Sequence, residues 1–118
     1  AGIDQPNNTV IRGRSFLPLL VGEPVPNWNN DLYAEYSTKH QSHTHMRMYR
    51  TPEWKLVRDF MNPDRDEFFD LVNDPMETTN LLSGSTDNAT ESIFQDLSGR
   101  IDQQMETIGD TVVNGLPF

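Results

Sequence analysis

The sequence predicts an α+β fold, a small antiparallel sheet of about four strands with a C-terminal helix packed on one face. Short runs rich in aromatic and branched residues, separated by turn-forming residues, fill residues 31–71. Apolar residues then recur at three- and four-residue steps between residues 94 and 108, which is the spacing of an amphipathic helix. The chain has 118 residues, the usual length of one domain.

The four expected strands are residues 31–37, 46–51, 54–60 and 67–71. The second and third strands flank the turn-forming Pro52, so they are expected to form an antiparallel hairpin. Trp54 alternates with other apolar residues inside its strand, which indicates a position in the core. Met46 and Met48 are interpreted in the same way, as core packing.

The residues after the last expected strand resemble the start of a helix. Asp74 can serve as an N-cap, Pro75 suits the first helical position, and Glu77 completes a capping box. The chain is therefore expected to turn sharply at Asp74 and to enter a helical turn.

The C-terminal helix is predicted from its apolar stripe and from its end signals. The stripe consists of Phe94, Leu97, Ile101, Met105 and Ile108. Thr90 or Ser92 is the expected N-cap, and Ser92 with Gln95 has the pattern of a capping box. Gly109 is well placed to end the helix, which is expected to lie across the sheet.

The chain is expected to form one unit, residues 1–118, with three parts. Residues 1–30 are an irregular lead, rich in Asn and Pro, with a short helix near residues 15–20 that Ser15 can cap. Residues 31–82 hold the sheet and the capped turn, and residues 83–118 hold a polar linker and the C-terminal helix.

Charge and composition disfavour several classes of partner. The chain has 18 acidic and 9 basic residues, a net charge of -9, which repels nucleic acids and anionic membrane surfaces. No apolar run approaches the roughly 20 residues of a membrane span. The sequence contains no cysteine, so disulfides and thiolate metal sites are excluded. We therefore expect neither a nucleic-acid partner nor a membrane partner.

A series of short motifs runs through most of the chain in a fixed order. They comprise Ala1, Gly2 and Ile3, then Gly13, Arg14, Ser15, Phe16, Leu17, Pro18, Leu19, Leu20, Val21 and Gly22, then Tyr33, Ala34, Glu35 and Tyr36, then Arg47, Arg50, Trp54, Lys55 and Leu56, then Phe69, Asp70, Leu71, Asp74, Pro75, Glu77, Asn80 and Leu81. This order resembles the C-terminal subdomain of the formylglycine-dependent sulfatases, in the alkaline-phosphatase-like superfamily. Phe69 departs from the pattern, because that family usually has tyrosine there.

The resemblance implies that this chain is the end of a larger enzyme. The sulfatase nucleophile lies in a Cys/Ser-x-Pro-x-Arg motif, which this sequence lacks, and the family's calcium ligands lie upstream of the matched region. The expected function is a subdomain of a sulfuric ester hydrolase that supports the catalytic domain, helps to line its substrate cleft and is not catalytic alone. Formylglycine and calcium are expected in the missing catalytic domain. No catalytic residue and no metal ligand are expected in this chain. By family resemblance we expect a periplasmic or secreted location.

The resemblance also implies candidates for contact with the organic part of a sulfated sugar or aryl substrate. These candidates are His43, His45, Arg47, Lys39 and Trp28. Cations and imidazoles suit a sulfated ligand, and an aromatic ring in a loop can stack on a sugar. Two simpler interpretations stay open, namely that the histidines are solvated or hydrogen bonded and that Arg47 and Arg50 pair with acids on the sheet.

An independent carbohydrate- or protein-binding module is the alternative function. In that case Trp28 and the histidine-rich loop, residues 40–45, would contact the partner. The two functions differ in what precedes the chain, because only a sulfatase gene would encode the nucleophile motif and paired aspartates upstream of Ala1.

Overall fold

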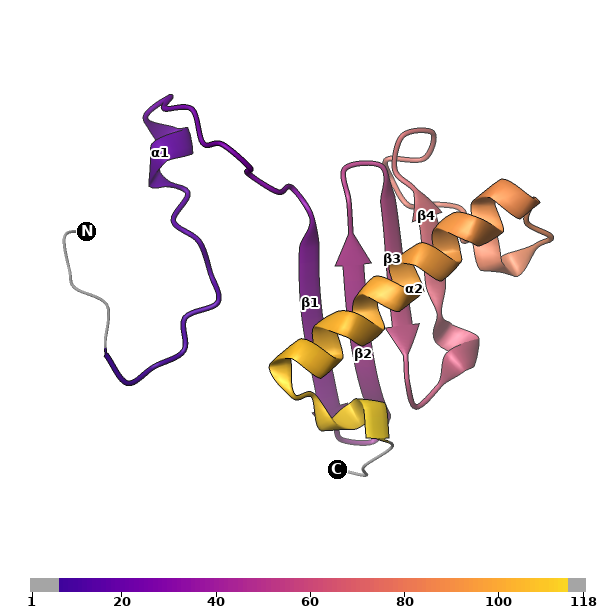
Figure 1. Ribbon diagram of the computed structural model, residues 1–118. Helices are drawn as coiled ribbons and strands as arrows, with labels where there is room; N and C mark the ends of the chain where they lie inside the picture. The colour runs from indigo at the N-terminus through magenta and orange to yellow at the C-terminus, as the bar shows by residue number, and fades with distance from the viewer. Residues whose placement is uncertain (1–6, 115–118) are drawn as a thin grey trace.

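Four antiparallel strands form one sheet in the order β1-β2-β3-β4, and a long helix, α2, crosses one face of it (Figure 1). The structure is a computed structural model that describes residues 7–114, with side chains to residue 112. The strands are β1 Leu32–Lys39, β2 His43–Arg50, β3 Trp54–Asp59 and β4 Glu67–Asp70, and the helix is α2 Asn88–Ile108. The predicted α+β fold is confirmed, as are all four strands and the hairpin between β2 and β3. The predicted loop over residues 40–45 was too long, because β2 begins at His43, where pairing with β1 extends the strand.

The core lies between α2 and the sheet face that it covers. Tyr49, Leu56 and Phe68 come from three neighbouring strands and are joined across the sheet by register, Tyr49 to Leu56 and Leu56 to Phe68. Three residues of the predicted helical stripe, Leu97, Ile101 and Met105, pack against them and are buried. Trp54 is half-buried at the edge of this cluster, where its ring stacks on Phe68 with the centroids 5.3 Å apart.

The other face of the sheet is not covered by α2. Side chains alternate between faces along a strand, so Met46 and Met48 point away from the helix when their neighbours Arg47 and Tyr49 point toward it. Both methionines are half-buried and line a shallow hollow of about 260 Å³ with Val57. The prediction that Met46 and Met48 are core residues was wrong, because the apolar character of a side chain does not indicate which face of the sheet the helix covers.

The start of α2 is set by a residue before the predicted caps, whereas its end is set by the predicted glycine. Asp87 is the N-cap, and its carboxylate accepts a hydrogen bond from the Thr90 N–H at 2.7 Å. The predictions of Thr90 or Ser92 as the cap were wrong, because Asp87 is an equally good cap and lets the helix start earlier. Gly109 ends the helix with φ of 70°, as predicted, in the left-handed region that suits glycine.

The turn at Asp74 forms without the predicted helix. The Asp74 carboxylate accepts hydrogen bonds from the Thr78 hydroxyl at 2.9 Å and the Thr79 N–H at 2.8 Å. Glu77 has φ of 55°, which breaks a right-handed helix, and its carboxylate forms an ion pair with Lys55 on β3 instead of a capping box. Asp74 therefore closes a loop. The groups that donate to its carboxylate, on Thr78 and Thr79, lie further along the chain than the N–H groups that an N-cap would bind.

The remaining elements are short. They are α1 Leu17–Leu20, η1 Pro63–Arg65, η2 Leu81–Ser83 and η3 Thr111–Asn114. The predicted short helix in the lead is thus a single turn, and Ser15 contributes by accepting a hydrogen bond from the Leu17 N–H at 3.3 Å. Residues 7–31, here called the N-terminal arm, extend away from the sheet (Figure 1). Within residues 7–114, no helix is long and apolar enough to cross a membrane.

Candidate functional site

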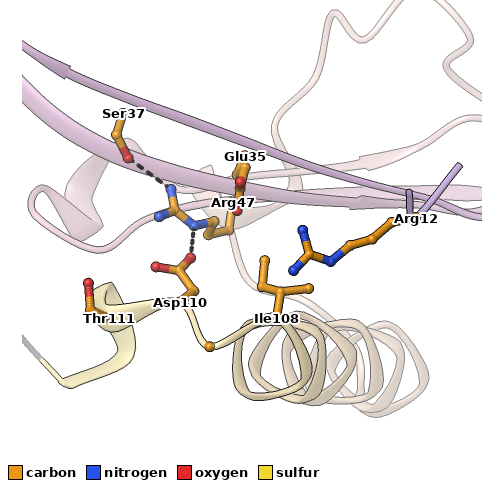
Figure 2. A pocket seen from close by; sticks show the side chains of 8 residues that line it. Arg12, Glu35, Ser37, Arg47, Ile108, Asp110 and Thr111 are labelled. Atoms are coloured by element: carbon orange, nitrogen blue, oxygen red, sulfur yellow. Dashed lines mark hydrogen bonds and ion pairs between the residues drawn. The ribbon is translucent and has the colours of Figure 1, made fainter. Parts of the chain in front are cut away.

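A polar hollow of about 440 Å³ lies where α2 ends beside β1 and β2 (Figure 2). It is lined by Arg12, Glu35, Ser37, Arg47, Ile108, Gly109, Asp110 and Thr111. The hollow exists because Gly109 turns the chain sharply after α2, which aims Asp110 back at the sheet. Three separate parts of the sequence therefore meet here, namely the N-terminal arm, the β1–β2 hairpin and the end of α2.

Arg47 forms the floor of this hollow and is held there by several hydrogen bonds. Its Nε donates to the Asp110 carboxylate at 2.5 Å, and its Nη1 donates to Ser37 Oγ at 3.1 Å and to the Met46 carbonyl at 2.7 Å. The two charged side chains are 4% and 8% exposed. The hydrogen bond from Arg47 lowers the pKa of Asp110, so the pair stays ionised near neutral pH. Arg47 thus pairs with an acid from the end of α2, not with one on the sheet.

Two polar groups beside Arg47 are buried, the His45 side chain and the hydroxyl of the half-buried Tyr33. His45 shares a hydrogen bond between its Nδ1 and Ser37 Oγ, 2.8 Å apart. Tyr33 lies beside the ion pair, and burial raises the pKa of its hydroxyl to about 12, against the opposing effect of the Arg47 charge. Tyr33 is therefore a neutral phenol at physiological pH. Ser37, His45, Arg47 and Asp110 thus form a hydrogen-bonded network at the base of the hollow, with the Tyr33 hydroxyl beside it.

Arg12 is the cation of the hollow that the sequence analysis missed. It lies on the N-terminal arm, is exposed, and points into the hollow above Ile108 (Figure 2). Among the described residues it makes no hydrogen bond or ion pair, in contrast to Arg47. No sequence signal identified it, because a single arginine in an irregular segment gives no indication of which strand end it will approach.

Lys39 and His43 lie at the end of the sheet next to the hollow. They face each other in register across the β1–β2 turn, and both are exposed. The same register places Ser37 opposite His45 on the same face of the sheet. The structure therefore brings Lys39, His43, His45 and Arg47 to one end of the hairpin.

Trp28 lies apart from the other predicted contacts. It precedes β1, whereas Lys39 ends that strand, and eight residues of strand span about 26 Å. Its indole N–H donates to Asn30 Oδ1 at 3.1 Å, and the Arg14 guanidinium lies 5.3 Å from its ring centroid. Trp28 is thus a half-exposed part of the arm.

The described residues do not supply a metal cage. No group of three or more His, Asp or Glu side chains in residues 7–114 is arranged to hold a metal ion. The calcium ion that the sulfatase resemblance implies is expected in the catalytic domain and not in this part of the protein.

Comparison with known proteins identifies the class to which this sheet, helix and arm belong. Two solved structures with the same fold are a protein assigned to the sulfatases from Bacteroides thetaiotaomicron VPI-5482, with a TM-score of 0.78 at 24% identity, and BT4656 in complex with its substrate D-glucosamine-2-N,6-O-disulfate, with a TM-score of 0.69 at 21% identity. They cover 98% and 92% of this chain, and the chain spans only 24% and 22% of theirs. This chain therefore has the same fold as about a quarter of each of these two structures.

The sequence identifies the family itself. Residues 1–107 match the family described as N-sulphoglucosamine sulphohydrolase, C-terminal, and the chain belongs to that family. A search of curated proteins gave no match. The resemblance to the sulfatase C-terminal subdomain is confirmed, and the family match favours it over the independent binding module.

Proposed function

We propose that this chain supports the catalytic domain of a sulfatase and lines one side of its substrate cleft with the end of the β1–β2 hairpin. The observation that carries the proposal is the family match over residues 1–107, which includes the arm, the sheet and most of α2. The chain spans about a quarter of the length of its structural relatives, so the remaining sulfatase machinery would be encoded outside it.

The sequence lacks the motif that forms the sulfatase nucleophile. A formylglycine nucleophile needs the Cys/Ser-x-Pro-x-Arg motif, and none occurs in the 118 residues. Hydrolysis of the sulfate ester would therefore take place on the catalytic domain, together with calcium. This chain would contribute binding and orientation of the substrate, which favour the reaction by holding the scissile group in place.

The hollow is the part of the chain best suited to a sulfated sugar. Arg12 lines the hollow, and Lys39 lies outside its lining at the end of the β1–β2 hairpin; both are exposed cations on a chain whose net charge is -9. Hydrogen bonds from cations to sulfate or carboxylate oxygens are stronger than those between neutral groups. BT4656 binds a doubly sulfated glucosamine, and we propose sulfated amino sugars as the substrate class here. Arg47 would act indirectly, by fixing the floor of the hollow.

We expect Arg12→Ala and Lys39→Ala, each made in the complete enzyme, to raise KM for a sulfated saccharide about tenfold and to change kcat little. Loss of one charge-assisted hydrogen bond accounts for this size of effect. Steady-state kinetics on a sulfated disaccharide and on a small aryl sulfate would test it, because the aryl sulfate lacks the sugar that these cations would bind.

The matched control is Arg50→Ala, which removes an exposed cation at the opposite end of β2 from His43 and on the face of the sheet away from the hollow. This variant should keep the KM of the unmodified enzyme. If all three variants bind the saccharide equally well, the hollow does not line the substrate cleft.

A further inference from the structure

The N-terminal arm exposes more large apolar side chains than any other part of the described chain. Its exposed members are Val10, Ile11, Phe16, Leu17, Leu19, Leu20 and Val21, with exposed fractions between 42% and 78%. The whole of α1 contributes no buried residue. A contiguous apolar segment of this kind marks a contact surface.

The arm also lies outside the body formed by the sheet and α2 (Figure 1). The radius of gyration is 17.0 Å, whereas a compact chain of this length has about 13.5 Å. The apolar side chains of the arm thus find little cover on their own domain.

Despite its exposure, the arm has a defined shape. Arg14 donates to the Asn27 carbonyl at 3.1 Å and packs over Trp28, which ties the two ends of the α1 loop together. Gly22 allows the chain to turn back after α1, with φ of 76°. A loop held in this way loses little conformational entropy when it binds, so it is suited to docking.

The comparisons indicate what covers the arm. The family match begins at residue 1, and the Bacteroides structure aligns with 98% of this chain, so both include the arm. That structure is a polypeptide about four times as long as this chain. A protein of that length has additional chain that can cover the arm.

We propose that the N-terminal arm is the docking surface through which this chain binds the rest of its own sulfatase, with the side chains of α1 seated in an apolar groove of the catalytic domain. This inference rests on the proposed function, since it takes the catalytic domain as the partner. It adds that α1, rather than the uncovered face of the sheet, is the main attachment.

Hydrogen exchange on the complete enzyme tests the proposal without any measurement of activity. We expect the amides of Leu19, Leu20 and Val21 to exchange roughly 100-fold more slowly than exposed amides, because docking would bury them. Exchange of these amides at the rate of an exposed loop overturns the proposal.

A substitution test uses the same complete enzyme. Leu20→Asp should lower the apparent melting temperature by on the order of 5 °C and speed exchange throughout α1. The matched control is Val72→Asp, which changes a residue 65% exposed in the turn after β4 and should leave both quantities unchanged. Equal effects of the two variants would contradict the proposal.

Two further outcomes separate this inference from its rivals and from the proposed function. If Leu20→Asp converts a dimer of the enzyme into a monomer with α1 still folded, a second copy covers the arm and the inference is wrong. If α1 is protected while Arg12→Ala and Lys39→Ala leave KM unchanged, the docking surface stands and only the cleft role fails.

Discussion

Replacing Asp59 with alanine is expected to lower the free energy of unfolding by about 3–4 kcal/mol, although the residue lies outside the hollow. Asp59 ends β3, and its side chain is 1% exposed. Its carboxylate accepts hydrogen bonds from the Thr44 hydroxyl at 2.6 Å, the Asn62 amide at 2.8 Å, and the N–H groups of Met61 at 3.0 Å and His45 at 3.2 Å. Removing it would leave four donors unsatisfied where β2, β3 and the following turn meet.

Urea unfolding followed by tryptophan fluorescence measures this loss. The matched control is Asp64→Ala, which removes an exposed carboxylate from η1 five residues away and should change stability by less than about 0.5 kcal/mol. Asp59→Asn keeps the shape but offers one acceptor oxygen in place of two, so its loss should be intermediate. A loss from Asp59→Ala no larger than that from Asp64→Ala would show that water replaces the carboxylate without cost.

The same residue predicts a defined dependence of stability on pH. Burial alone would raise the pKa of Asp59, but its hydrogen bonds, led by those from Thr44 and Asn62, outweigh burial and lower the pKa to about 2 from 3.8. The unfolded chain therefore binds more protons than the folded chain between about pH 2 and 4. The lowered pKa of Asp59 therefore adds about 2 kcal/mol to the free energy of unfolding above pH 4. This contribution is lost as the pH falls from about 4 to about 2. The stability difference between the natural chain and Asp59→Asn should shrink by this amount on acidification, and a constant difference would refute the assignment.

The strands and the long helix could be predicted because each depends on local periodicity. Alternating apolar residues and Pro52 are sufficient for the β2–β3 hairpin, and the stripe of Leu97, Ile101 and Met105 is sufficient for α2. These patterns are repeated over many residues, so one misleading residue does not alter the result. Single residues with several possible partners could not be predicted in this way.

Helix starts and contacts distant in sequence are decided by competition between such residues. Asp87, Thr90 and Ser92 are all acceptable N-caps, and the sequence does not rank them. Glu77 suits a capping box, but the ammonium of Lys55 on β3 is a stronger partner for its carboxylate. The hollow depends on a contact between Arg47 and Asp110, 63 residues apart, and no local pattern indicates that pairing.

Replacing Arg47 with alanine is expected to lower the free energy of unfolding by about 3–5 kcal/mol, because it would leave the buried Asp110 carboxylate without its cation. The Asp110→Asn variant would leave the guanidinium unpaired in the same place. The double variant should cost less than the sum of the two, because it removes both buried charges together. Chemical unfolding of the single and double variants measures the coupling between the two side chains.

The Arg58–Asp102 pair provides the matched control on the same face of the sheet. It also joins a strand to the helical layer, at 3.1 Å, but its side chains are 27% and 48% exposed, so breaking it should cost less than about 1 kcal/mol. Burial, not the presence of an ion pair, is then what makes Arg47 important.

If Arg47→Ala leaves stability nearly unchanged but weakens binding of a sulfated saccharide, Arg47 contacts the substrate directly. If it destabilises the fold as strongly as expected, its primary role is to anchor the end of α2 beneath the hollow.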